Sequence, residues 1–272
     1  MVLKEKIEHK PGQKMADWAM DVIACPKCKQ PLGQTDNVLY CKECHSAYSN
    51  EQGIPSLISE KLANSLDEGK EIVKHYYFAE EHYDWTRDPK ALELAYHRYR
   101  KWETWKQVEK MMRPGTIALD IGCGTGLITN EFRRRFQRVI ALDLNRWALS
   151  RMDGKPFVCK VQGDGEVLPI QDESVDLIVA TEMIEHLEAP EKTAREIYRV
   201  LKKNGRVVGS VPSTSNIWKW RQYLSMTCGG GEPFHRNFTR SQIAKLWKDA
   251  GFKVTVKSSC LGLNWLWVLE KA

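Results

Sequence analysis

Four cysteines near the start of the chain have the spacing of metal ligands. Cys25 and Cys28 form one Cys-x-x-Cys pair, and Cys41 and Cys44 form a second pair after twelve intervening residues. Two such turns facing each other close a tetrahedral cage of four sulfurs, which most often holds zinc. A rubredoxin-like iron fits the same ligands, and two disulfides or four unrelated thiols are the alternative without a metal. Because a ribbon of roughly forty residues is too small to build its own core, we expect the metal to supply the folding energy.

A second group of residues has the pattern of a nucleotide site. The loop Gly122-Cys123-Gly124-Thr125-Gly126 follows an apolar run, and its glycines permit a sharp turn and close approach to a ligand. The spacing is GxGxG, which differs from the GxGxxG of dinucleotide folds and from the P-loop. Asp143 and Asp164 follow the next two apolar runs, where a carboxylate can accept ribose hydroxyls or an adenine amino group. Helix caps or loop carboxylates are the alternative for these residues.

The composition allows a large globular domain to position both sites. The chain has 272 residues, 42% hydrophobic and 28% charged, which excludes a disordered or fibrous protein. Its formal net charge of +6 permits an RNA or membrane-surface partner without requiring one. No stretch reaches the ~18 apolar residues of a membrane span, and no hydrophobic run follows the charged N-terminus as in a secretory signal. We therefore expect a cytoplasmic protein.

From Thr116 onward, short apolar runs alternate with amphipathic segments. The runs that predict strands are 117–119, 139–142, 158–161, 177–180, 207–211, 253–259 and 265–269. The segments 127–136, 190–203 and 241–251 have helical periodicity. This alternation indicates an α/β fold with a parallel sheet covered on both faces. Upstream, Tyr96, Tyr99, Trp102 and Trp105 recur at helical spacing, and we expect this aromatic stripe to pack on the core.

The cysteine region resembles small zinc-ribbon proteins that bind and activate methyltransferases. The sequence CPKCKQPL, then CKEC, then Tyr48 and Gly53-Ile54-Pro55 carries the resemblance, over about residues 21–60. It implies a partner or stabilising module without a catalytic role, here fused to its client. The alternative is a ribbon that grips RNA through Lys27, Lys29 and Lys42.

The remainder resembles the class I S-adenosylmethionine-dependent methyltransferases, most of all the ubiquinone and menaquinone biosynthesis branch. LDIGCGTG, ALDLN, GDGEVLP, SVDLIVATEMIEHL and REIYRVLKKNGRVVGSVP match in order and spacing, over about residues 113–272. The resemblance implies a Rossmann-like sheet of seven strands, the last one antiparallel, with S-adenosylmethionine at the carboxyl ends of the strands. We expect four parts: an N-terminal tail (1–20), the zinc ribbon (21–60), a helical connector with the first helices of the catalytic domain (61–112) and the cofactor-binding methyltransferase domain (113–272).

The resemblance also assigns roles to residues. Those expected to contact the cofactor are Asp120, Gly122, Cys123, Gly124, Gly126, Asp143, Leu144, Asp164, Gly165 and Glu182. The three glycines would lie along the methionine part of the cofactor, and Asp120 would lie near the amino group of that part. Asp143 would hold the ribose, and Asp164 with Gly165 would hold the adenine.

Methyl transfer from a sulfonium is an in-line displacement, so the protein has to align the acceptor and exclude water. A hydroxyl or protonated amine acceptor also needs a base. The candidate catalytic residues are Glu185, His186 and His235. Glu182, Glu185 and His186 would share one face of a helical turn and could hold Mg²⁺, as the matching residues of quinone-biosynthesis O-methyltransferases are associated with it. The alternative is a helix start that packs under the cofactor.

These features predict a methyltransferase that acts on a small-molecule or lipid-like acceptor, at oxygen. Aromatic and basic residues around Trp218 and Trp220 are compatible with a lipid, with stacked RNA bases or with a packed helix. The alternative function is an rRNA or tRNA methyltransferase whose ribbon holds the RNA. A non-catalytic scaffold is disfavoured by the intact glycine loop and Asp143. The ribbon could also bind a protein partner.

Overall fold

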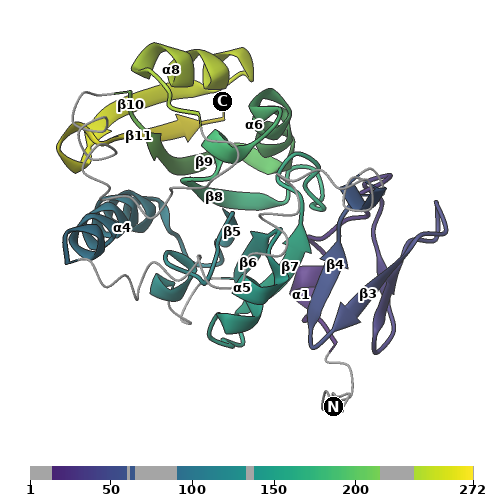
Figure 1. Ribbon diagram of the computed structural model, residues 1–272. Helices are drawn as coiled ribbons and strands as arrows, with labels where there is room; N and C mark the ends of the chain where they lie inside the picture. Colours follow the sequence, from purple (N-terminus) through teal and green to yellow (C-terminus); the bar gives the residue numbers. More distant parts are fainter. Residues whose placement is uncertain (1–13, 60–61, 65–90, 133–137, 215–235, 272) are drawn as a thin grey trace.

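The computed structural model describes residues 14–59, 62–64, 91–132, 138–214 and 236–271, and one mixed sheet forms its centre (Figure 1). The helices are α1 (Asp17–Met20), α4 (Ala91–Met111), α5 (Arg146–Arg151), α6 (Pro190–Val200) and α8 (Arg240–Asp249), with 3-10 turns η2 (Thr129–Glu131), η3 (Ile184–His186) and η4 (Cys260–Gly262). The ribbon strands are β1 (Gly33–Gln34), β2 (Val38–Tyr40), β3 (Ala47–Glu51) and β4 (Ile54–Leu57). The later strands are β5 (Ile117–Ile121), β6 (Arg138–Asp143), β7 (Val158–Gly163), β8 (Val175–Thr181), β9 (Leu201–Pro212), β10 (Lys253–Ser259) and β11 (Asn264–Glu270).

The strand order is β1-β2-β3-β4-β7-β6-β5-β8-β9-β11-β10. The predicted α/β class is confirmed, and the last strand, β11, runs antiparallel to both of its neighbours. The sheet within the described ranges holds eleven strands instead of a separate sheet of seven: β5–β11 supply seven, and the ribbon supplies four. The difference arises because the four ribbon strands continue the sheet of the following domain instead of forming a separate unit.

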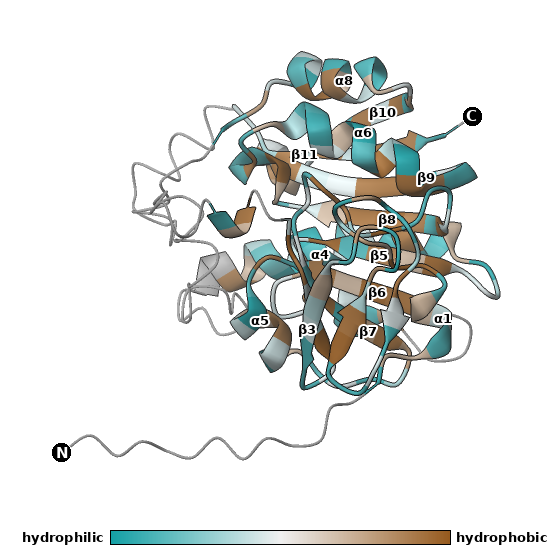
Figure 2. Ribbon diagram, turned by 90° about the vertical axis from the view of Figure 1, so that its right-hand side faces the viewer, coloured by the Kyte–Doolittle hydropathy of each residue, from teal (hydrophilic) through white to brown (hydrophobic). Residues whose placement is uncertain are grey.

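Each face of the sheet is covered by its own helices, because successive strand residues point to opposite sides. On one face Ala118 of β5 and Val179 of β8 pack with Val108 of α4. On the other face Leu119 and Ile178 belong to the core that also contains the buried residues of α6 and α8. Figure 2 shows that the strands of the sheet are mainly apolar. Burial on both faces explains why the strands read as nearly continuous apolar runs.

The ribbon docks on its own chain, edge to edge with the sheet. Strand β4 pairs in parallel with β7, and the register places Leu57 opposite Gly163. The Ala24 N–H donates to the Pro169 carbonyl at 2.9 Å. Leu39 and Leu57 of the ribbon are fully buried within the same core as the domain's own residues. The ribbon therefore contributes to one continuous core and lies against the segment that follows β7.

The helix predicted at 127–136 is wrong in its described part, where residues 127–132 contain only the turn η2. Thr129 is fully buried and its Oγ1 donates to Asp120 Oδ2 at 2.6 Å. The Asn130 side chain donates to the Thr125 carbonyl at 3.4 Å. Both side chains are thus directed back to the loop, and such residues compete with regular helix. Residues 133–137 lie outside the described part.

Within the described ranges, no helix has both the length and the apolar character that a membrane span needs. The boundaries expected at residues 20, 60 and 112 stay predictions. Of the connector between the last two boundaries, the structure describes only residues 62–64 and the helix α4 with the residue after it.

Candidate functional site

The glycine loop follows β5 directly, and its backbone is left-handed at three glycines. The φ angle is +68° at Gly122, +53° at Gly124 and +91° at Gly126, a region that other residues seldom adopt. Gly122 also lacks room for a side chain, since a Cβ there would lie 2.8 Å from the Met183 Cβ. Its N–H donates to the Leu142 carbonyl at 2.8 Å. The loop therefore crosses the carboxyl ends of β5 and β6 with bare backbone, as close approach of a nucleotide requires.

Asp143 ends β6 and fastens this loop. Its Oδ2 accepts the Gly124 N–H at 2.7 Å and its Oδ1 accepts the Asn145 N–H at 2.8 Å. Burial raises the pKa of Asp143, while these backbone donors favour the charged form. The Leu144 N–H is a third backbone donor to this carboxylate. An ionised carboxylate has about four acceptor positions, so about one remains for a ribose hydroxyl. The residue fits the role that the resemblance implies.

Asp120 is buried at the end of β5 beside the loop. Burial, followed by the charge of Asp143, raises the pKa of Asp120 to about 7, and the Thr129 hydroxyl works against this shift. The side chain therefore changes charge near neutral pH. A bound ammonium, such as the amino group of methionine, would favour its ionised form.

Asp164 and Gly165 stand after β7, the strand that also pairs with the ribbon. The Asp164 Oδ1 accepts the Glu166 N–H at 2.8 Å, and burial raises the pKa of Asp164. A Cβ on Gly165 would lie 3.0 Å from the Met183 Cε. Met183 thus lies against both Gly165 and Gly122.

Cys123 and Leu144 complete the group at the carboxyl ends of β5, β6 and β7. Burial, followed by the charges of Asp143 and Asp120, raises the pKa of the Cys123 thiol, so the side chain is neutral. The Leu144 carbonyl accepts the side-chain amide of Gln162 at 3.0 Å. All the expected cofactor residues except Glu182 therefore gather along three adjacent strand ends.

Glu182 faces other elements. It follows β8 with a left-handed φ of +51°. Its Oε1 accepts the Ser210 hydroxyl at 2.6 Å and the Asn264 side-chain amide at 2.7 Å, and its Oε2 lies 3.1 Å from Arg100 Nη1. These contacts connect β8 with β9, β11 and α4. A cofactor contact by Glu182 stays a prediction.

The prediction that one helical turn gathers Glu182, Glu185 and His186 on the same face is wrong. The turn η3 begins only at Ile184, and the left-handed Glu182 lies outside it. Glu185 is buried, with its Oε1 3.8 Å from His186 Nε2. Among the described His, Cys, Asp and Glu residues, only the four ribbon cysteines converge as a metal site. The magnesium hypothesis finds no support in this geometry.

His235, the third candidate catalytic residue, lies outside the described residues, as do Trp218 and Trp220. The next residue, Arg236, donates its N–H to the Glu185 carbonyl at 3.1 Å. The described chain therefore resumes directly beside η3.

The four ribbon cysteines form the predicted cage. The Sγ atoms of Cys25 and Cys44 are 3.5 Å apart, those of Cys28 and Cys41 are 3.4 Å apart, and all four lie within 4.8 Å of one another. A tetrahedral zinc with Zn–S bonds of about 2.3 Å needs sulfurs about 3.8 Å apart, so the cage fits this ion. Hydrogen bonds with Ser46 lower the pKa of the Cys44 thiol to about 6, whereas burial and the neighbouring thiols raise the pKa of Cys28 to about 12. The disulfide alternative is wrong for the described cysteines, all of which are free thiols.

Lys29 points from the ribbon into the domain. Its Nζ donates to the Leu168 carbonyl at 2.9 Å and lies 3.1 Å from Glu196 Oε2. Glu196 is held in turn by Arg199 through two hydrogen bonds of 2.7 Å. This network, rather than RNA, engages Lys29.

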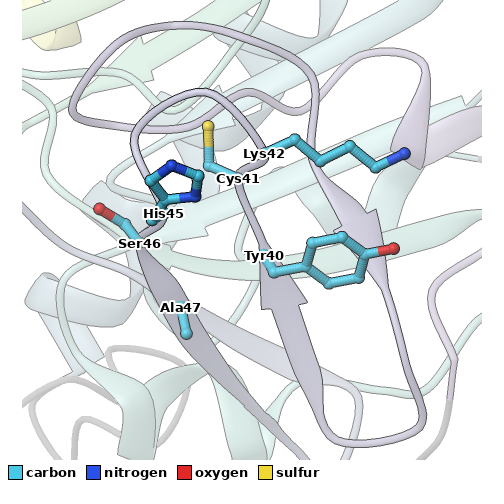
Figure 3. Close-up of a pocket in the computed structure, with 6 residues that line it drawn as sticks. All are labelled: Tyr40, Cys41, Lys42, His45, Ser46 and Ala47. Carbon is cyan, nitrogen blue, oxygen red and sulfur yellow. The ribbon is translucent and has the colours of Figure 1, made fainter.

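The other two lysines that were candidates for RNA contact, Lys27 and Lys42, are exposed. A hollow of about 430 Å³ lies at the second cysteine turn. Figure 3 shows the residues that line it: Tyr40, Cys41, Lys42, His45, Ser46 and Ala47. Because ribbon residues alone line it, this hollow is separate from the glycine loop.

The polar end of α4 was missed by the sequence reasoning. The Tyr96 hydroxyl donates to Asn264 Oδ1 at 2.6 Å, and Arg100 Nη2 lies 3.3 Å from His97 Nδ1. Because a guanidinium can only donate, His97 Nδ1 is the acceptor of this contact. His97 and Arg100 are both buried. The available signal was a His and an Arg three residues apart within the aromatic stripe.

Two family models match the chain. Residues 119–209 match a model described as a methyltransferase domain, and residues 19–51 match one described as Trm112p-like protein. A malonyl-[acyl-carrier protein] O-methyltransferase of Hahella chejuensis is 28% identical over 147 residues, which cover 52% of this chain and 52% of that protein. Its namesake in a Marinomonas species is 34% identical over 117 residues, covering 38% and 42%. The chain spans about half the length of the curated relatives it matches.

Solved structures have the same fold. A chain in the complex that contains the Haloferax volcanii Trm112 methyltransferase activator aligns with a TM-score of 0.52 at 20% identity, over 63% of this chain and 89% of that chain. A Thermotoga maritima S-adenosylmethionine-dependent methyltransferase aligns with a TM-score of 0.51 at 20% identity, over 65% and 92%. Residues 119–209 therefore form a methyltransferase domain, and the solved structures share its fold. Ahead of this domain, the chain carries a Trm112p-like ribbon with a four-cysteine cage.

Proposed function

We propose that the chain transfers the methyl group of S-adenosylmethionine to an oxygen of a small-molecule or lipid-like acceptor. The observation that carries the cofactor half of this proposal is the row of Asp120, Asp143 and Asp164 at three adjacent strand ends around a left-handed glycine loop. The similarity to malonyl-[acyl-carrier protein] O-methyltransferases supports oxygen as the methylated atom.

When bound, the cofactor supplies a methyl group that is already activated by its sulfonium. The chain's own residues then have to hold and orient it. Asp143 retains about one acceptor position for the ribose while its Oδ2 holds the Gly124 N–H of the glycine loop, so one side chain couples the ligand to the loop. Asp164 stands on the next strand end for the adenine, and Met183 supplies the apolar contact between the two glycines.

An oxygen acceptor has to lose a proton during or before methyl transfer. We assign this task to the group of His186, Glu185 and His235. Glu185 is almost fully buried, and its Oε1 lies 3.8 Å from His186 Nε2, so the carboxyl stands beside the imidazole that would take the proton. His235 belongs to this group by its place in the sequence, immediately before Arg236, which is bonded to η3.

The proposal includes a cytoplasmic location, where reduced thiols remain available to bind zinc. It also retains a protein partner of the ribbon, because the ribbon is similar to proteins described as Trm112p-like. The alternative function, RNA methylation, relied on three ribbon lysines for RNA contact. One of them, Lys29, is bonded to residues of this chain instead.

The test is incubation of the zinc-loaded full chain with S-adenosylmethionine carrying a tritiated methyl group, together with phenols, acyl carboxylates, extracted lipids or RNA. We expect label in the organic phase, and release of labelled methanol by alkali would identify a methyl ester. Label that enters only RNA would contradict the proposal. Label in nitrogen-methylated products alone would contradict its assignment to oxygen.

A further inference from the structure

The outer face of α4 and the neighbouring turn η4 carry a cluster of exposed apolar side chains. Within the described residues, four large hydrophobic side chains are exposed, and three of them lie here: Tyr99 (45% exposed), Trp102 (48%) and Leu261 (89%). The Tyr99 and Trp102 ring centroids are 5.4 Å apart. We name Tyr99, Trp102 and Leu261 the α4–η4 patch. Single exposed apolar residues are common, but a cluster marks a contact surface.

Leu261 is held outward by a turn that is firmly anchored. Both Cys260 and Leu261 have left-handed backbones, with φ of +49° and +56°, which is unfavourable for residues with a branched or bulky side chain. The Cys260 N–H donates to Glu103 of α4 at 3.2 Å, and Ser213 donates through its hydroxyl to the Gly262 carbonyl at 2.5 Å. These bonds attach the turn to α4 and to the end of β9. The surrounding structure therefore stabilises a strained backbone that presents a leucine to solvent.

The rim of the patch is mainly cationic. Arg98, Lys106 and Lys110 are exposed on the same face of α4 as Tyr99 and Trp102, at spacings of three and four residues, together with the acid Glu109. A second acid, the half-buried Glu103, lies beside Tyr99 and is bonded to η4. The Lys106 Nζ lies 3.7 Å from the Trp102 ring centroid. Indole and phenol rings beside lysine and arginine are typical of surfaces that sit at the boundary between lipid headgroups and acyl chains.

The patch lies on the side of the sheet where the acceptor would enter. Ser213, which holds η4, directly follows β9, and the carboxyl end of this parallel strand faces the same side as the glycine loop. Figure 1 shows α4 next to the turn between β10 and β11. A surface docked through this patch would therefore be close to the mouth of the site.

We propose that the α4–η4 patch docks the enzyme on an anionic lipid bilayer. The cationic rim complements anionic headgroups, and the two rings fit the interface. Leu261 argues against single-stranded nucleic acid as the partner, because an aliphatic side chain offers neither a stacking ring nor a hydrogen bond. Its burial is favourable only in an apolar medium. The proposal deepens the proposed function by stating where a lipid-like acceptor is reached, but docking itself does not require methyl transfer.

The test is co-sedimentation of the zinc-loaded full chain with vesicles of phosphatidylcholine mixed with phosphatidylglycerol. The variants are Leu261→Gly, which suits the left-handed backbone, Trp102→Gln, and the two combined. Val38→Ser, which removes the fourth exposed apolar side chain, on the ribbon, is the matched control. We expect the parent and the control to bind, and the double variant to bind at least about tenfold more weakly.

A parent that does not sediment with these vesicles, or a double variant that binds as well as the parent, would overturn the proposal. Competition by a single-stranded RNA oligomer that depends on Trp102 would overturn it in favour of a nucleic-acid surface. S-adenosylhomocysteine binding by the same preparations separates the two claims. Variants that no longer bind vesicles but still bind S-adenosylhomocysteine would support docking. A parent that binds vesicles but does not bind S-adenosylhomocysteine would support docking and contradict the proposed function.

Discussion

Lys29 connects the ribbon to the methyltransferase domain, and replacing it with Met is expected to destabilise both together. Loss of one partner of a buried ion pair costs about 3–5 kcal/mol, and of an exposed pair about 0–1 kcal/mol. Lys29 falls between these limits, because its side chain is 26% exposed and that of Glu196 is 17% exposed. In the variant, Glu196 keeps both bonds to Arg199, and the Leu168 carbonyl keeps the Arg199 Nη2 donor at 3.1 Å. No buried charge is left alone, so we expect a loss of about 1–2 kcal/mol.

The assay is urea unfolding of Lys29→Met and the parent at one fixed zinc concentration, followed by tryptophan fluorescence and far-ultraviolet circular dichroism. Lys42→Met, which removes an exposed lysine from the second cysteine turn, is the control and is expected to change stability by less than about 0.5 kcal/mol. We expect a single shifted transition with both probes, because ribbon and domain share a sheet and a core. Equal loss in both variants, or an early separate transition of the ribbon in Lys29→Met, would refute the reasoning.

Three further predictions concern titration and metals. Because burial raises the pKa of Asp120 from 3.8 to about 7, the folded state holds its proton longer than the unfolded state, so stability should fall as pH rises between these values. Asp120→Asn, which keeps an acceptor for the Thr129 hydroxyl, should remove this fall in the free energy of unfolding between the two pH values. An unchanged slope in the variant would contradict the pKa shift. Removal of zinc with a chelator should lower the unfolding midpoint of the whole chain, because β4 is a strand of the common sheet; calorimetry that shows only a small ribbon transition would contradict this. Methyl transfer by zinc-replete protein should not respond to added Mg²⁺, because Glu182 is engaged by Arg100, and a clear stimulation in a titration would show the opposite.

The features that depend on short spacings could be predicted from the sequence. The two Cys-x-x-Cys pairs determine a cage almost by themselves, and the structure brings their sulfurs together. The position of Asp120, Asp143 and Asp164 also followed from the sequence, because each carboxylate lies at or just after an apolar run. Parallel strands place such residues at one edge of the sheet.

The features that depend on tertiary partners could not be predicted. Lys27 and Lys29 look alike in the sequence, but Lys27 is exposed, whereas Lys29 meets Glu196 of α6, which lies far along the chain. Glu182 was grouped with Glu185 by helical spacing, yet its backbone is left-handed and its partners come from three other elements. No local pattern contains that information.

The aromatic stripe of α4 was also only partly predictable. Trp105 packs on the core as expected, with its ring centroid 5.2 Å from that of Phe132. Tyr99 and Trp102 are exposed, because the buried face of the helix turns away from them. Periodicity identifies a helix and its faces, but it cannot say that an aromatic residue on the outer face serves another contact.

The most direct test of the central claim is calorimetric binding of S-adenosylhomocysteine to the zinc-loaded full chain. The account predicts one site per chain that depends on Asp143. Asp143→Ala should weaken binding by about 10–100-fold, because hydrogen bonds to a charged group are worth about 1.5–3 kcal/mol. Asp153→Ala, which removes an exposed carboxylate ten residues further on, should bind like the parent. A folded parent that does not bind S-adenosylhomocysteine, or equal affinity in Asp143→Ala, would contradict the account.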